Sequence, residues 1–251
     1  MAVSILAVIP ARYQSQRFPG KPLVKIGSRP DSPTMVQRVY ESAKSCPAFD
    51  RVIVATESEK IAACVREFGG EVELTSDTHE TGTDRIAEVA ARHPDYKVVV
   101  NVQGDQPFVR ANMLNQLVAP YLTEAALPDM TTLACPLDLE NDLENPNVAK
   151  VICDRQSNAL YFSRSPIPYF RKQQAAPVYH HLGLYAFRAD FLATYTQLEA
   201  TPLEQCESLE QLRVLEHGYR IRVCQTETGI IEINTPEDLT LAQALIAEGK
   251  L

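Results

Sequence analysis

A loop rich in cations follows the first apolar run of the sequence. Residues 11–22 (ARYQSQRFPGKP) contain Arg12, Arg17 and Lys21, with Gly20 among them. Cationic side chains can neutralise a polyphosphate, and backbone N–H groups beside a glycine can approach its oxygens unhindered. The loop matches neither G-x-G-x-x-G nor G-x-x-x-x-G-K-[ST], so neither a Rossmann dinucleotide site nor a P-loop is supported. The alternative interpretation is a solvated basic loop.

One carboxylate, Asp105, follows the most β-branched run of the chain, in the segment Val102–Pro107 (VQGDQP). Mg²⁺ binds carboxylate and phosphate oxygens and keeps several waters, so one or two acidic ligands suffice. Open α/β sheets bind ligands at the carboxyl ends of their strands. We therefore expect Arg12, Lys21 and Asp105 to share one cleft that binds a polyphosphate through magnesium. The alternative is that Asp105 is only a turn residue.

The elements that must position these loops alternate along the first half of the chain. Apolar runs of strand length are separated by segments of helical period, which indicates parallel βαβ units with helices on both faces. Strands are predicted over Ile5–Pro10, Arg51–Thr56, Glu71–Leu74 and Lys97–Val102. Helices are predicted over Met35–Ala43 with Ser32-Pro33 as N-cap and first position, after the second strand to about Phe68, and over Thr83–Arg92.

The second half is less regular. Strands are predicted at Met130–Cys135, Val148–Cys153, Asn158–Phe162, His181–Phe187 and Arg220–Gln225, with helices over Leu203–Glu216 and from about Thr235. We expect a single domain over residues 1–251. Its fold class is α/β, a doubly wound and mostly parallel sheet with a smaller additional sheet.

Composition narrows the class of protein. The 251 residues include 24 Lys+Arg and 32 Asp+Glu, a formal charge of −8, and an acidic chain lacks the cation surplus that nucleic-acid binding needs. No run approaches the ~20 apolar residues of a membrane span, and the N-terminus lacks the basic start of a secretory signal. Six separated cysteines without metal-site spacing are typical of reduced thiols. We expect a cytoplasmic protein without nucleic-acid binding or membrane insertion.

Eight segments, in order and over nearly the whole chain, resemble the CMP-Kdo synthetase (3-deoxy-manno-octulosonate cytidylyltransferase) family. No single segment would suffice. They are Ile9–Leu23 (IPARYQSQRFPGKPL), Thr81–Arg85 (TGTDR), Asn101–Pro107 (NVQGDQP), Asn145–Val151 (NPNVAKV), Ala159–Pro168 (ALYFSRSPIP), His180–Arg188 (HHLGLYAFR), Ser208–Gly218 (SLEQLRVLEHG) and Asn234–Leu239 (NTPEDL). CMP-sialic acid synthetases share the nucleotide loop but not the LEQLR segment.

The resemblance implies a nucleotide-diphospho-sugar transferase-like fold and metal-assisted nucleotidyl transfer. The anomeric hydroxyl of a 2-keto-3-deoxy sugar acid would attack the α-phosphorus of CTP in line, and pyrophosphate would leave without a covalent intermediate. With 3-deoxy-D-manno-octulosonate (Kdo), the product would be CMP-Kdo, for lipopolysaccharide biosynthesis. The resemblance also implies Mg²⁺ as cofactor and a homodimer.

The resemblance implies residue roles as well. The catalytic residues would be Arg12, Lys21 and Asp105. The nucleotide would be bound by Pro10, Ala11, Arg12, Ser15, Lys21, Gly82 and Thr83. The sugar acid would be bound by Arg85, Gln103, Arg164 (at its carboxylate), His181, Tyr185, Glu210 and Gln211. Each also has a structural alternative: Tyr185 as a core residue, the His180–His181 pair as a surface feature, and Glu210 with Arg213 as a helix-surface pair.

The clearest departure from the family pattern is Asn234. The family motif reads D-T-P-E-D, with the first Asp as second metal ligand beside Asp105; an Asn carbonyl can bind Mg²⁺ but brings no charge. In a regular strand Glu232 would project to the same side as Asn234 and compensate for that charge. Glu237 and Asp238, after Thr235-Pro236, are interpreted as helix-capping residues.

Two further departures leave the substrate and activity open. Gln106 replaces a frequent Glu, as in a variant branch that activates the 8-amino analogue of Kdo; another 2-keto-3-deoxy acid of the sialic type is a further alternative. Residues 29–33 form an insertion. A non-catalytic nucleotide- or sugar-binding homologue is the competing hypothesis, because of Asn234. A glycosyltransferase would need a D-x-D motif, which Gly104-Asp105-Gln106 does not supply.

Overall fold

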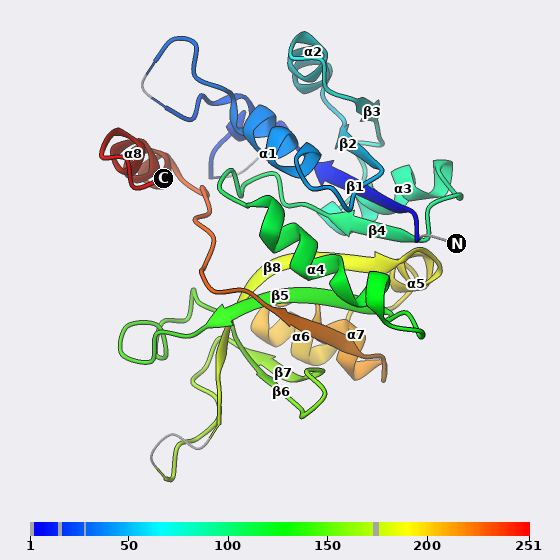
Figure 1. Ribbon diagram of the computed structural model, residues 1–251, viewed down its shortest axis with the longest axis vertical. Helices are drawn as coiled ribbons and strands as arrows, with labels where there is room; N and C mark the ends of the chain where they lie inside the picture. The colour runs from blue at the N-terminus through cyan, green and yellow to red at the C-terminus, as the bar shows by residue number, and fades with distance from the viewer. Residues whose placement is uncertain (1–2, 15–16, 28, 173–175) are drawn as a thin grey trace. The chain divides into compact units, whose positions relative to one another are not determined.

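The computed structural model describes residues 3–14, 17–27, 29–172 and 176–251. They form two compact units, Met1–Asn115 with Ile230–Leu251 and Gln116–Gly229, coloured along the chain in Figure 1. The chain passes from the first unit to the second within α4 (Ala111–Thr123). The single domain expected from the sequence stays a prediction.

The first unit is built on four parallel strands in the order β3-β2-β1-β4. Their bounds are β1 (Ile5–Pro10), β2 (Arg51–Thr56), β3 (Val72–Leu74) and β4 (Val98–Asn101). The side chains of β1 from Ile5 to Ile9 are fully buried, as expected for an apolar strand covered on both faces.

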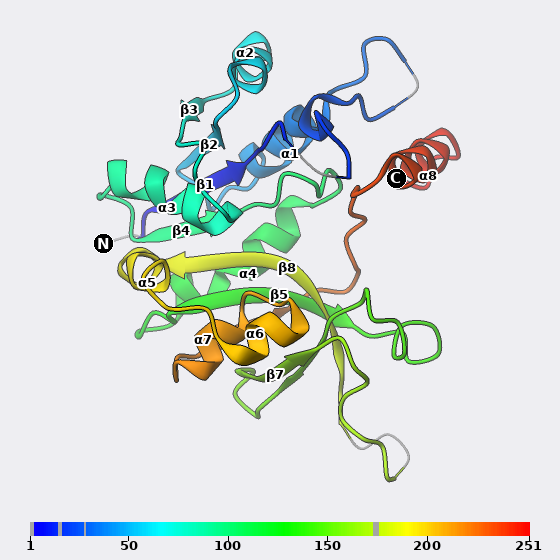
Figure 2. The ribbon, with the colours of Figure 1, turned by 180° about the vertical axis from the view of Figure 1, so that it is seen from behind.

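The crossovers of this sheet reverse direction at β1. The chain runs from β1 through β2 to β3 on one side and then returns to β4 on the other side of β1. Because such crossovers are right-handed, α1 (Met35–Lys44) and α2 (Glu59–Glu67) cover one face and α3 (Gly82–Arg92) covers the other (Figures 1 and 2). The reversal between β1 and β4 marks the crevice where doubly wound sheets bind ligands.

Residues 230–251 return to this first unit and complete it. Ile233 and Ala242 pack in one buried cluster with Ile26 and Met35. The last helix, α8 (Pro236–Ala247), begins at Thr235, whose side chain and that of Asp238 form a capping box. The capping prediction for this segment is therefore confirmed for Asp238.

The second unit holds a mixed sheet in which β5 lies between β8 and β9. The β5·β8 pair is antiparallel, the β5·β9 pair is parallel, and β6 pairs antiparallel with β7 and with one end of β8. The strands are β5 (Met130–Pro136), β6 (Lys150–Cys153), β7 (Ala159–Ser163), β8 (Tyr179–Arg188) and β9 (Ile221–Gln225). The helices are α5 (Ala189–Tyr195), α6 (Pro202–Glu207) and α7 (Leu212–Glu216).

Two helix predictions were wrong. The helix expected over Leu203–Glu216 is split into α6 and α7, because Ser208 adopts a left-handed conformation with φ of 52°. The N-cap of α1 is Thr34 and not Ser32: Thr34 Oγ1 accepts from the N–H of Gln37 at 3.3 Å. The helices α4 and α5 were not predicted.

The predicted fold class is confirmed: a mixed α/β structure with a mostly parallel sheet and additional strands. Across the part of the chain that the structure describes, no helix has both the length and the apolar character required to cross a membrane.

Candidate active site

The loops after β1 and β4 meet at a point of close backbone contact. A Cβ added to Gly104 would stand 2.7 Å from the carbonyl oxygen of Pro10, so only glycine fits there. On the other side of Pro10, a Cβ on Gly82 would lie 3.3 Å from the proline ring. These two glycines allow three loops of the first unit to gather around the end of β1.

Lys21 joins the first of these loops to the second. It lies in a short 3-10 helix, η1 (Lys21–Leu23), which begins after Gly20 at φ of 72°. Its Nζ donates to Asp105 Oδ2 at 3.0 Å and to Asn234 Oδ1 at 3.5 Å. A carboxylate oxygen and an amide oxygen thus converge on one cation, at the carboxyl ends of β1 and β4.

The return segment holds Asn234 in that position. The N–H of Ile233 donates to the carbonyl of Asp105 at 2.9 Å, and the N–H of Asn234 donates to Asp238 Oδ2 at 2.8 Å. Arg17 also donates to Asn234 Oδ1, at 3.5 Å. A backbone contact and a hydrogen bond to the capping residue Asp238 therefore fix Asn234, which the resemblance implies as a metal ligand.

Glu232 lies beside this group, although residues 231–234 form no regular strand. Its carboxylate accepts from Asn234 Nδ2 at 3.1 Å and from Gln106 Nε2 at 3.0 Å. Desolvation and the negative charge of Asp105 raise the pKa of Glu232 above its usual value. Because Glu232 accepts from the nitrogen of the Asn234 amide, it orients the amide oxygen toward Lys21.

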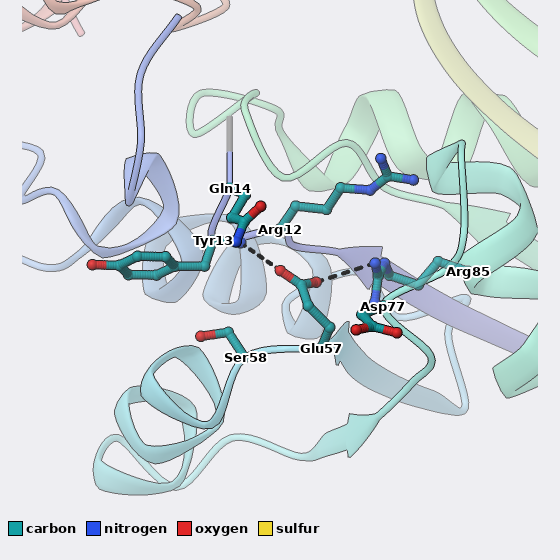
Figure 3. A pocket seen from close by; sticks show the side chains of 7 residues that line it. All are labelled: Arg12, Tyr13, Gln14, Glu57, Ser58, Asp77 and Arg85. Atoms are coloured by element: carbon teal, nitrogen blue, oxygen red, sulfur yellow. Dashed lines mark hydrogen bonds and ion pairs between the residues drawn. The ribbon is translucent and has the colours of Figure 1, made fainter. Parts of the chain in front are cut away.

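A pocket of about 480 Å³ lies at the ends of β1 and β2 (Figure 3). It is lined by Arg12, Tyr13, Gln14, Glu57, Ser58, Asp77 and Arg85. Figure 3 shows Glu57 between two partners: Oε1 accepts from the backbone N–H of Tyr13 at 2.8 Å, and Oε2 pairs with Arg85 NH2 at 3.1 Å. Cations and carboxylates on one wall can bind a polar group that carries both donors and acceptors.

Arg85 is almost fully buried, with 1% of its side chain exposed. It donates to Thr75 and pairs with Glu57, and burial lowers its pKa although Glu57 opposes that shift. Arg85 lies in the first turn of α3, whose N-cap Thr81 forms a capping box with Asp84. Arg85 therefore has Glu57 and Thr75 as partners in the structure. Its contact with the sugar acid stays a prediction.

The structure joins two of the three predicted catalytic residues directly. Lys21 and Asp105 form an ion pair, but Arg12 NH2 donates to the carbonyl of His79 at 2.5 Å. Neither Lys21 nor Asp105 lines the pocket that Arg12 lines. Within the described part of the chain, no cluster of three or more His, Cys, Asp or Glu suited to a metal ion occurs, so the predicted pair stands alone.

Three predicted sugar residues form a buried polar group in the second unit. Gln211 Nε2 lies 3.4 Å from His181 Nδ1, and Tyr185 donates its hydroxyl proton to Gln211 Oε1 at 3.1 Å. His181 Nε2 lies 2.9 Å from the hydroxyl of Thr132. Burial, with a smaller contribution from His180, lowers the pKa of His181 to about 3, so the ring is neutral.

Arg164 has structural partners in the same unit. Its guanidinium donates to the backbone carbonyls of Pro146, Glu207 and Ser208, at 2.8–3.3 Å. The Glu207 carboxylate accepts from the N–H of Arg164 at 2.9 Å and from Ser163 Oγ at 2.6 Å. These bonds hold the turn that precedes Glu210 and Gln211. Contact of Arg164 with a sugar carboxylate stays a prediction.

The structure places most of the remaining predicted site residues. Pro10 ends β1, Ala11 follows it, and Gly82 and Thr83 begin α3. Gln103 and Glu210 each have partners, and Ser15 lies outside the described residues. Glu57, Thr132 and Glu207 were missed. Glu57 directly follows β2 as Asp105 follows β4, so the same strand-end argument would have found it; Thr132 and Glu207 carry no local signal.

Comparisons with known proteins agree with this geometry. A family model described as cytidylyltransferase matches residues 6–221. The 3-deoxy-manno-octulosonate cytidylyltransferase of Acaryochloris marina is 65% identical, over 98% of this chain and 99% of that protein. The protein of the same name from Synechococcus elongatus is 55% identical, over 96% and 98%.

A solved structure supports the same assignment. It is a CMP:2-keto-3-deoxy-manno-octonic acid synthetase complexed with CTP, 38% identical to this chain, with a TM-score of 0.91 and coverage of 98% of this chain and 99% of its own. The chain therefore belongs to the 3-deoxy-manno-octulosonate cytidylyltransferase family.

Proposed function

We propose that this protein transfers CMP from CTP to the anomeric hydroxyl of 3-deoxy-D-manno-octulosonate and releases pyrophosphate. The observation that carries the proposal is the convergence of Asp105 Oδ2 and Asn234 Oδ1 on Lys21 Nζ at the carboxyl ends of β1 and β4. The identity of the relatives supports the choice of nucleotide and acid.

The two oxygens suit magnesium as the cofactor. Mg²⁺ prefers hard oxygen ligands, needs only one or two from the protein, and completes its shell with water and phosphate oxygens. Asp105 and Asn234 would hold it, because their oxygens already face a single cation. When bound, Mg²⁺ would neutralise charge on the phosphates of CTP.

The side chains of the first unit then bind and orient the nucleotide. Lys21, which lies in η1, would contact the phosphates, and its ammonium would stabilise the charge that develops on the leaving pyrophosphate. The pocket lined by Arg12, Glu57 and Asp77 is proposed to hold the nucleoside. In the second unit, Gln211, His181 and Tyr185 are proposed to bind the hydroxyls of the sugar acid.

Pyrophosphate release by the purified protein tests the proposal. We expect release with CTP, Kdo and Mg²⁺, little release with UTP, and at least ~100-fold less release by Asp105→Asn, because one charge of the metal site is lost. Glu237→Gln, in the first turn of α8, is the matched control and keeps activity. Release with the 8-amino analogue in place of Kdo would change the assigned acid; no release with any acid would identify a binding protein.

We further propose, from the family resemblance, that the protein acts in the cytoplasm as a homodimer. Sedimentation of the purified chain would give the mass of two copies of the 27.9 kDa chain. A sedimenting species of one copy at all concentrations would contradict the homodimer.

A further inference from the structure

In the second unit, a series of hydrogen bonds links Thr132 of β5 to three further buried side chains, and the donor and acceptor of each bond can be assigned. Thr132 is fully buried and His181, Tyr185 and Gln211 are nearly so. Thr132 Oγ1 donates to the carbonyl of Leu184 at 2.8 Å. Its hydroxyl carries one proton, so it can only accept from His181 Nε2, 2.9 Å away.

The direction of the first bond fixes all the others. If Nε2 of His181 carries the ring proton, Nδ1 is an acceptor and takes an N–H of the Gln211 amide. The amide oxygen of Gln211 then faces Tyr185 and accepts its hydroxyl proton at 3.1 Å. Any further partner of the Tyr185 oxygen must be a donor, such as a sugar hydroxyl.

An irregularity between β5 and β8 creates the acceptor on which this series of hydrogen bonds depends. Thr132 pairs with Tyr185 and Ala134 pairs with His181, so three residues of β8 face the one residue between them on β5. Gly183 adopts φ of 66° within that irregularity. The carbonyl of Leu184 accepts the hydroxyl proton of Thr132 at this point.

We propose that Thr132 is a positioning residue of the sugar subsite: through its bond to the Leu184 carbonyl it holds His181 as the Nε2–H tautomer and thereby orients Gln211 and Tyr185. The inference deepens the proposed function and rests on it for the identity of the sugar acid. The lowered pKa of His181 agrees with a ring that is neutral at working pH. His181 then acts by hydrogen bonding and not by proton transfer.

Two variants separate the hydroxyl of Thr132 from its shape. Thr132→Val keeps the volume and loses the hydroxyl, whereas Thr132→Ser keeps the hydroxyl. We expect Thr132→Val to raise KM for Kdo about 10-fold and leave KM for CTP within twofold, and Thr132→Ser to restore KM for Kdo. A KM for Kdo within twofold of wild type in Thr132→Val would overturn the proposal, as would equal loss in both variants.

A spectroscopic measurement tests the tautomer without turnover. Long-range ¹H–¹⁵N correlation of the full chain labelled at histidine, assigned with His181→Gln, should show a protonated Nε2 and an unprotonated Nδ1 for His181. A protonated Nδ1 would overturn the proposal even if Thr132→Val fails to fold. If the wild-type protein turned over no sugar acid, the proposed function would be wrong. The ¹H–¹⁵N correlation would still determine the tautomer of His181.

Discussion

At the scale of single residues, the candidate metal position combines one charge with one neutral amide. Asp105 carries the charge, and Asn234 supplies an oxygen whose direction is set by Glu232. Because a neutral ligand attracts a divalent cation less than a carboxylate does, bound Mg²⁺ would depend on the nearby carboxylate of Glu232. The charge of residue 234 and the charge of residue 232 can be changed one at a time.

We expect Asn234→Asp to lower the Mg²⁺ concentration for half-maximal activity about 10-fold, because a second carboxylate then faces the cation. Glu232→Gln should raise that concentration about as much, because it removes the neighbouring charge. Titration of pyrophosphate release with MgCl₂ measures both. Unchanged magnesium dependence in Glu232→Gln would remove Glu232 from the site; Glu248→Gln, on the far end of α8, is the control.

Burial of His181 predicts a pH dependence of stability. Its pKa is lowered to about 3 in the folded protein, whereas the unfolded chain binds a proton near the usual value of 6.5. Between these values the unfolded state holds more protons, so the free energy of unfolding falls as the pH is lowered. We expect this residue to account for about 2 kcal/mol between pH 7.5 and pH 5.

Urea unfolding of wild type and His181→Gln at the two pH values isolates that contribution. The fall in unfolding free energy should be smaller in the variant by about 2 kcal/mol, since glutamine does not titrate. An equal fall in both proteins would show that His181 is accessible to protons in the folded state.

At the scale of elements, the site depends on the close approach of the loop after β4 to the end of β1. The Pro10 carbonyl leaves no space for a Cβ at Gly104. We expect Gly104→Ala to lower the free energy of unfolding by about 1–3 kcal/mol, because the loop must move from Pro10. Activity should fall with it, since Asp105 is the next residue.

Thermal unfolding and pyrophosphate release check this expectation together. Gly229→Ala is the matched control, because a Cβ there would meet only the sulfur of Cys135 at 3.9 Å, an ordinary contact. Wild-type stability and activity of Gly104→Ala would mean that the close approach to Pro10 has no role.

The turn between α6 and α7 gives a second prediction at this scale. Glu207 binds Ser163 and the backbone of Arg164, and so ties the turn to the end of β7. We expect Glu207→Gln to raise KM for Kdo at least threefold, because the turn carries Glu210 and Gln211. Glu199→Gln, an exposed position, should leave it unchanged. Equal KM values in both variants would remove the turn from the sugar subsite.

The same turn shows where prediction from sequence ends. The alternation of apolar runs and helical periods predicted every strand of the first sheet to within a residue or two, because each signal is local. At the break, the guanidinium of Arg164, more than forty residues earlier, donates to the carbonyls of Glu207 and Ser208. The hydrophobic periodicity within Leu203–Glu216 does not indicate that contact.

In the candidate site, too, some residues could be predicted from local sequence signals and others could not. Lys21 and Asp105 were predicted because each follows a parallel strand, and such strand ends share an edge. Glu57 followed the same rule and was overlooked. Thr132 belongs to a buried strand and has no polar pattern around it, so its role emerges only from the irregular pairing of β5 with β8.

At the scale of the whole molecule, the two units carry different parts of the proposed reaction. Lys21, Asp105 and Asn234 belong to the first unit, and His181 and Gln211 belong to the second. A nucleotide that binds the folded protein and not the unfolded chain raises the free energy of unfolding by RT ln(1 + [L]/Kd), where [L] is the free nucleotide concentration.

We therefore expect CTP with Mg²⁺ at 100 times its Kd to stabilise the protein by about 2.7 kcal/mol and raise Tm. Differential scanning calorimetry with CTP, UTP and buffer measures the effect, and Asp105→Asn is expected to lose most of it. A UTP shift equal to the CTP shift would exclude base discrimination by the pocket that Glu57 and Asp77 line.

The return of residues 230–251 to the first unit has a consequence for synthesis of the chain. Lys21 and Asp105 leave the ribosome early, but Ile233 and Asn234 follow only after the entire second unit has been translated. The oxygen pair that would hold magnesium is thus assembled last. A nascent or prematurely terminated polypeptide that ends before residue 234 would therefore lack half of that pair.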